Sequence, residues 1–72
     1  MSSHYLNCFV KEGNIGVLKP ALTRHGAMIV SVTADGDNST VVALFENKSP
    51  KAMSDAENAA DKIANDSYWT EP

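Results

Sequence analysis

The chain has 72 residues, a formal net charge of −3 at pH 7 and a hydrophobic fraction of 43%. This composition suits a single domain over residues 1–72, near the lower size limit for folding on one core, and argues against disorder. A general nucleic-acid binder needs a clustered cationic surface. The six Lys and Arg residues are scattered, so no direct nucleic-acid partner is expected.

The first predicted element is a strand over residues 4–11, HYLNCFVK. Successive side chains of a strand point to opposite faces of its sheet. One face would carry Leu6, Cys8 and Val10, and the other would carry Tyr5, Asn7 and Phe9.

Residues 11–27, KEGNIGVLKPALTRHGA, admit two interpretations. In the first, a β-hairpin turns at Gly13-Asn14 and its second strand ends at Pro20. In the second, a glycine loop leads into a short helix that is capped by Gly26. The helix is favoured by apolar residues at helical intervals, namely Ile15, Leu18 and Leu22. Over residues 13–20 the hairpin stays open as the alternative.

Residues 27–34 and 40–46 are rich in β-branched residues and flank the turn formers DGDN at 35–38. A hairpin that is symmetric about Gly36-Asp37 would place six side chains on one core face: Met28, Val30, Val32, Val41, Ala43 and Phe45.

The segment 49–66, SPKAMSDAENAADKIAND, predicts an amphipathic helix. Its apolar repeat is Met53, Ala56, Ala60 and Ile63. Two starts compete, Ser49-Pro50 and a capping box of Ser54 with Glu57. We favour the earlier start because the repeat includes Met53, and we expect the acidic residues to lie on a solvated face. Residues 67–70, SYWT, are a candidate short edge strand.

These elements predict an α+β two-layer sandwich in the order β-α-β-β-α. A three-stranded sheet would carry both helices on one face. The strand that comes third in the chain would lie in the sheet between the first and the second. The segment 67–70 would add a short fourth strand at an edge.

Two stretches, Gly16-Val17-Leu18 and Gly26-Ala27-Met28-Ile29-Val30, resemble the start of an ACT domain, a ferredoxin-like βαββαβ regulatory module. The resemblance covers residues 5–46 and, by position, the second helix. It implies a module that dimerises and binds a small amino acid through the loop after the first strand. The residues carried over to that site are Asn14, Gly16, Val17 and Leu18.

By size and acidic character the chain also resembles small phage-encoded proteins that inhibit host machinery, such as RNA polymerase inhibitors and anti-CRISPR proteins. This resemblance implies a bacterial protein complex as the partner.

No constellation of residues indicates catalysis. His4 and His25 lie in different elements and lack a cysteine or carboxylate at metal-ligand spacing. Cys8 has no positioned base, and GNIG followed by VLKP does not match a phosphate loop. We expect a protein that is not an enzyme and that has no catalytic residues, no metal and no cofactor.

Cysteine and hydropathy patterns predict the compartment. Cys8 is the single cysteine, so an internal disulfide cannot form. The sequence has no apolar run long enough to span a bilayer, and its first residues lack the layout of a secretion signal. A cytoplasmic protein without a membrane partner is expected, located in the host cytoplasm if the protein is phage-encoded.

Two helices can cover only one face of such a sheet, which leaves the other face apolar and exposed. Exposed apolar and aromatic side chains mark association sites. The predicted partner-binding residues are Tyr5, Phe9, Ile29, Val42, Leu44, Tyr68 and Trp69. The first hypothesis is a protein-binding inhibitor or modulator that blocks a bacterial assembly such as a CRISPR effector or RNA polymerase. The alternative is an ACT-like module that binds a small amino acid at residues 13–18, with a homodimer through the sheet.

Overall fold

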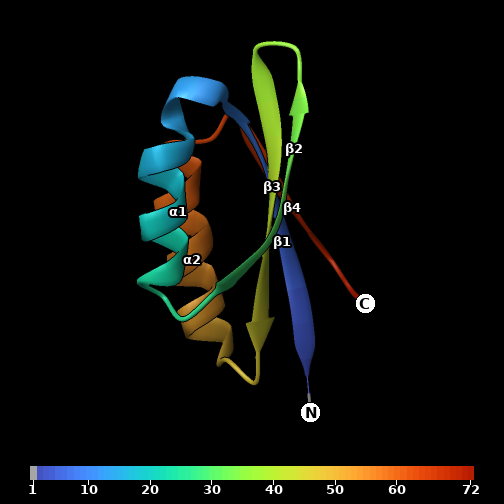
Figure 1. The fold of residues 1–72 in the computed structure, drawn as a ribbon. Coiled ribbons are helices and arrows are strands. Elements are labelled where there is room, and N and C mark those ends of the chain that lie inside the picture. The colour runs from blue at the N-terminus through green and yellow to red at the C-terminus, as the bar shows by residue number, and fades with distance from the viewer. Residues whose placement is uncertain (1) are drawn as a thin grey trace.

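The computed structural model describes residues 2–72, which form a four-stranded sheet and two α-helices (Figure 1). In chain order the elements are β1 (Ser3–Lys11), the 3₁₀ turn η1 (Glu12–Asn14), α1 (Ile15–Thr23), β2 (Met28–Asp35), β3 (Asn38–Glu46), α2 (Pro50–Asp61) and β4 (Asp66–Thr70). Both helices lie on the same face of the sheet (Figure 1). This is the predicted α+β sandwich, and the candidate strand at 67–70 is present as β4.

The sheet has the order β2-β3-β1-β4 and is antiparallel throughout. The predicted position of the third strand, between the first and the second, is confirmed. β1 and β3 pair at the centre, where Leu6 lies opposite Ala43. On the other side of β1, the side-chain amide of Asn7 donates hydrogen bonds to the Tyr68 carbonyl and to Thr70 Oγ1. The two edges of the sheet are therefore the long strand β2 and the short strand β4.

Residues 15–23 form a helix, so the hairpin interpretation of this segment is wrong. The predicted apolar stripe faces the core and comprises Ile15, Leu18 and Leu22. The helix ends in a Schellman motif, in which the Gly26 N–H donates to the Thr23 carbonyl and the Ala27 N–H donates to the Leu22 carbonyl. Gly26 has a φ of +88°, a conformation that glycine adopts without the cost of a Cβ. The predicted role of Gly26 as the cap is confirmed.

β2 and β3 form the predicted hairpin around a two-residue turn. Gly36 in this turn has a φ of +66°, as a tight hairpin turn requires. The predicted pairing holds over residues 31–35, where Val32 lies opposite Val41.

A β-bulge at Val30 changes the pairing in the first part of β2. Beyond the bulge, Ile29 lies opposite Ala43 and Met28 lies opposite Leu44. A shift of one residue exchanges the faces of a strand, so Ile29 packs against the core and Met28 lies on the open face of the sheet. The predicted core positions of Met28 and Val30 are therefore wrong.

α2 begins at the earlier of its two predicted starts. Ser49 Oγ accepts a hydrogen bond from the Ala52 N–H at 3.1 Å, and Pro50 is the first helical residue. The predicted apolar repeat packs against the sheet through Met53, Ala56, Ala60 and Ile63.

The core lies between the two helices and the inner face of the sheet. Its strand residues are fully buried and comprise Leu6, Cys8, Val10, Val41, Ala43 and Phe45. Burial, followed by the negative charges of Asp61 and Glu57, raises the pKa of the Cys8 thiol from 9.0 to about 11. Cys8 is thus a core residue whose thiol stays neutral at physiological pH.

Candidate functional site

The open face of the sheet carries most of the apolar side chains predicted there. Four of them are half-buried: Tyr5, Phe9, Val42 and Leu44. Tyr68 is 54% exposed on the same face, since it pairs with Asn7 of β1. The predicted position of Ile29 on the open face is wrong, because the bulge turns this side chain toward the core. Trp69 also lies on the helix-facing side, where it packs against the core, so its predicted exposure is wrong.

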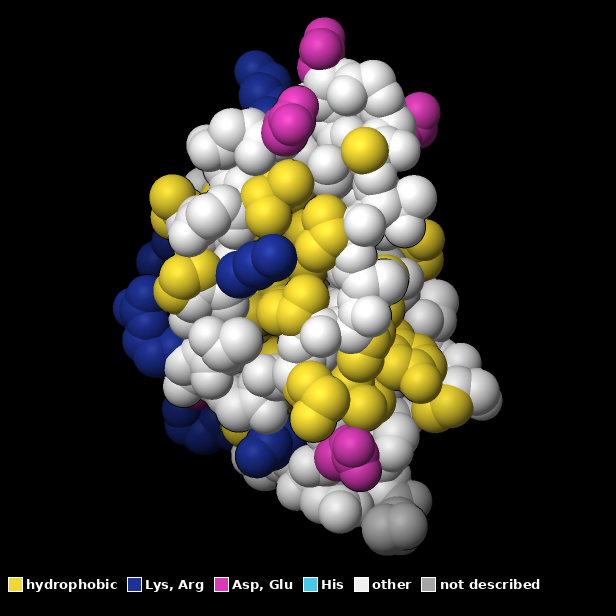
Figure 2. All heavy atoms as spheres, viewed as in Figure 1, with side chains coloured by type: hydrophobic (Ala, Val, Ile, Leu, Met, Phe, Trp, Pro, Cys, Tyr) yellow, Lys and Arg dark blue, Asp and Glu magenta, His cyan; other side chains and the backbone are white. Residues whose placement is uncertain are grey.

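The edge strand β2 is the most exposed part of the sheet. Three of its large aliphatic side chains are accessible, with Met28 62%, Val30 45% and Val32 41% exposed. Val32 lies opposite Val41, as predicted. It is not a buried core residue, however, because β2 is an edge strand and the helices do not cover Val32. Figure 2 shows hydrophobic side chains gathered over α1 and β2, the elements that form this side of the molecule. Exposed Val17 of α1, at 58%, adds to this apolar surface.

The connection from β1 to α1 holds the residues that the ACT resemblance assigns to a ligand. Asn14 and Gly16 are exposed, whereas Leu18 is fully buried. A Cβ at Gly16 would meet no atom within 4 Å, so the space beside it is open. The Glu12 N–H donates to the Asp37 carbonyl at 3.1 Å, which holds this connection beside the β2–β3 turn. A ligand here would contact Asn14, Gly16 and Val17, while Leu18 supports the helix from within.

Among residues 2–72 the structure shows neither a cluster of metal-ligating side chains nor an exposed cysteine. Residues 2–72 contain no group of three His, Cys, Asp or Glu side chains that could hold a metal ion. Cys8 is buried, and its raised pKa disfavours the thiolate that a nucleophile requires.

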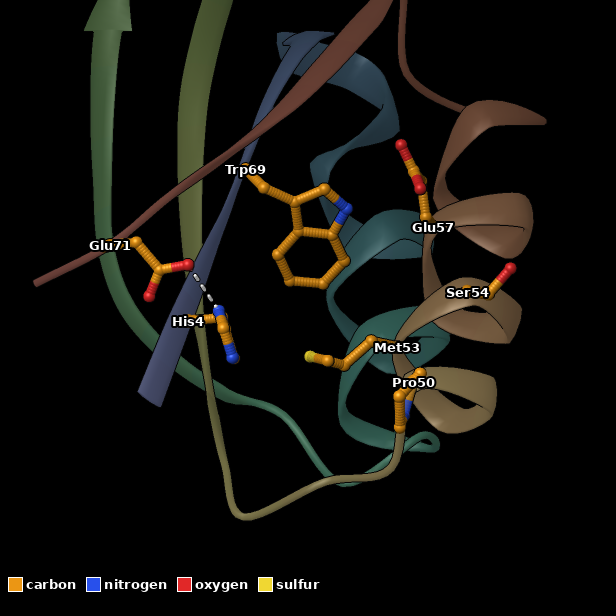
Figure 3. A pocket seen from close by; sticks show the side chains of 7 residues that line it. All are labelled: His4, Pro50, Met53, Ser54, Glu57, Trp69 and Glu71. Atoms are coloured by element: carbon orange, nitrogen blue, oxygen red, sulfur yellow. Dashed lines mark hydrogen bonds and ion pairs between the residues drawn. The ribbon is translucent and has the colours of Figure 1, made fainter. Parts of the chain in front are cut away.

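A pocket of about 340 Å³ lies between α2 and the β4 side of the sheet (Figure 3). Its lining residues come from the start of β1, from α2 and from the end of the chain: His4, Pro50, Met53, Ser54, Glu57, Trp69 and Glu71. Figure 3 shows the Trp69 indole between Glu71 and His4 on one side and the α2 residues on the other. His4 Nδ1 donates to Glu71 Oε1 at 2.7 Å, which joins the start of β1 to the chain end.

No pattern in the sequence predicted this pocket. We expected Glu57 on a solvated face, but it is half-buried and lines the pocket. The available signal was the spacing of Met53 and Glu57, four residues apart on one side of a helix. Their position opposite Trp69 depends on β4, which the sequence indicates only as a candidate strand.

No helix within residues 2–72 is both long and apolar enough to cross a membrane.

Comparison with known proteins gives a match at the level of structure. No protein-family model matches the sequence, and no curated protein matches it either. The solution structure of the C-terminal domain of the MgtC protein from Mycobacterium tuberculosis superposes with a TM-score of 0.75 and 10% sequence identity. The match covers 100% of this chain and 88% of that one. The chain therefore has the ferredoxin-like, ACT-like βαββαβ fold that the resemblance implies.

Proposed function

We propose that this domain is a non-catalytic regulatory module that self-associates side by side through β2 and binds a small amino acid near residues 14–17. The observation that carries the proposal is the exposed apolar edge of β2. The ACT-like fold, which the chain shares with the MgtC C-terminal domain, supports it as a resemblance of architecture.

The edge of β2 suits pairing with a second copy. An unpaired edge strand presents free backbone N–H and C=O groups, and a long apolar one is a template for another strand. β2 has eight residues, and residues 31–35 continue regularly beyond the bulge. Antiparallel pairing there would satisfy the outer backbone groups and cover Val30 and Val32. β4 has five residues and begins at Asp66, and short edge strands are poor templates.

The amino-acid site would lie at the same end of the molecule as the β2–β3 turn. The Ile15 N–H already donates to the Glu12 carbonyl. The N–H groups that follow it in the first turn of α1 have no partner within the helix, and these would receive a carboxylate. Asn14 adds a side-chain amide, and the open space beside Gly16 admits a ligand. The second copy would close the site from the β2 side.

Sedimentation velocity tests the self-association. We expect a concentration-dependent dimer for the wild type and a monomer for Val32→Lys, because the added charge would be buried in the edge pairing. Asn58→Lys, which adds the same charge on the exposed side of α2, should still dimerise. A wild type that stays monomeric at millimolar concentration would exclude the proposed interface.

A thermal-shift screen against the amino acids tests the ligand. A ligand that binds only the folded state raises the melting temperature by mass action. We expect one or a few amino acids to do so for the wild type, with the effect lost in Asn14→Ala. If no amino acid raises the melting temperature, the proposed ligand binding is excluded. The proposed self-association would be unaffected by that result.

A second candidate function uses the open face of the sheet, which no helix covers (Figure 1). In this proposal the domain is an inhibitor that docks on a bacterial assembly such as RNA polymerase or a CRISPR effector. Phe9→Ser with Leu44→Ser should abolish capture of that assembly while circular dichroism shows an intact fold. Capture that survives both changes would exclude the open face as the binding surface.

A further inference from the structure

We propose that the pocket between α2 and β4 binds a small organic ammonium ion, with its charge between Glu57 and Glu71 and its apolar body against Trp69. This site is separate from residues 14–17 and from the β2 edge, so it goes beyond the function proposed above. The volume of about 340 Å³ lies within the range of pockets that hold small molecules.

Trp69 provides a fixed aromatic surface on one side of the pocket. Its ring meets Phe45 edge-to-face, with centroids 5.3 Å apart and an interplanar angle of 63°. His4 makes a second edge contact at 6.5 Å and 89°. These contacts hold the indole in place from the core and from β1. An indole face attracts a cation through its quadrupole, and more strongly than the other aromatic side chains do.

The charges around the pocket have one sign. Two carboxylates, those of Glu57 and Glu71, are among its lining residues, whereas Lys and Arg are not. Glu71 is bonded to His4, while Glu57 has no ion-pair or hydrogen-bond partner among residues 2–72. A half-buried carboxylate without a partner is the group that gains most from a bound cation.

The negative charge of α2 also acts inside the protein. After burial itself, Asp61 and Glu57 contribute to the raised pKa of the Cys8 thiol. At the pocket itself, the carboxylates of Glu57 and Glu71 favour a cationic ligand over an anionic one.

The apolar walls indicate an organic cation. Met53 and Pro50 present carbon and sulfur opposite the indole (Figure 3). No group of three metal-ligating side chains is present among residues 2–72. A trimethylammonium group matches this combination, since it spreads its charge over methyl groups that pack well against an aromatic ring.

Choline is the probe for the test, and its matched control is the neutral alcohol in which a tert-butyl group replaces the trimethylammonium group. Trp69 is the single tryptophan, so the protein has one indole N–H resonance, and that resonance reports directly on the pocket. Titration of the full chain should shift this resonance with choline at millimolar concentration, and the neutral alcohol should bind at least about fivefold more weakly.

Two charge-matched variants complete the design. Glu57→Gln should weaken choline binding about three- to tenfold. Glu12→Gln removes the same charge at a position that follows β1, whereas the pocket residue His4 lies near the start of β1. This variant should leave the affinity for choline unchanged. No indole shift with choline, equal binding of the neutral alcohol, or equal weakening by both variants would each overturn the proposal. Because both substitutions replace half-buried or exposed carboxylates, circular dichroism should show both variants folded.

Discussion

Raising the pH above 9 should destabilise this domain through Cys8. Burial, followed by the charges of Asp61 and Glu57, raises the pKa of this thiol from 9.0 to about 11. The unfolded chain therefore loses its thiol proton at a lower pH than the folded chain. The contribution of this group to stability is complete below pH 9 and is lost as the pH rises from 9 toward 11. From these two pKa values, the free energy of unfolding should fall by about 1.4 kcal/mol at pH 10.

Urea unfolding of the wild type and of Cys8→Ala, at pH 8 and at pH 10, measures this loss. Alanine removes the thiol and leaves every other titrating group in both proteins. The wild type should lose about 1.4 kcal/mol more than the variant between the two pH values. Equal losses in the two proteins would mean that the thiol does not lose its proton at a higher pH in the folded chain, and hence that it is not buried beneath α2.

Three further predictions concern the folded state. Leu22→Ala should lower the free energy of unfolding by about 2–5 kcal/mol, whereas Val17→Ala in the same helix should change it by less than about 0.5 kcal/mol; similar costs would contradict the orientation of α1. Ser49→Ala removes the cap of α2 and should cost about 1 kcal/mol in urea unfolding, and an unchanged midpoint would contradict the cap. Gly26→Ala should cost about 1–2 kcal/mol because of its positive φ, while Gly13→Ala should be nearly neutral because Gly13 has no positive φ and an added Cβ would meet no atom within 4 Å. Equal destabilisation by these two changes in thermal melts would contradict the assignment.

The sequence predicts most of the fold because local signals agree with one another. The helix over residues 15–23 follows from its apolar stripe and from Gly26, and the start of α2 follows from Ser49-Pro50. The face of β1 that carries Leu6 and Cys8 follows from simple alternation, and the core confirms it.

The errors arise where a single residue changes the pairing or where distant segments meet. Nothing in MIVSV marks Val30 as a bulge, yet the bulge moves Ile29 to the core face and Met28 to the open face. The pocket around Trp69 joins residues from β1, α2 and the chain end. The contact of His4 with Glu71 spans 67 positions in the sequence, and no local pattern encodes such a pairing.

Amide hydrogen exchange as a function of protein concentration tests self-association through β2 most directly, because it reports on each edge separately. We expect the outward-facing amides of Met28–Asp35, which do not pair with β3, to become protected on going from low micromolar to millimolar protein, while those of Asp66–Thr70 do not change. Protection in β2 that is independent of concentration, or protection that appears in β4 instead, would exclude self-association through β2.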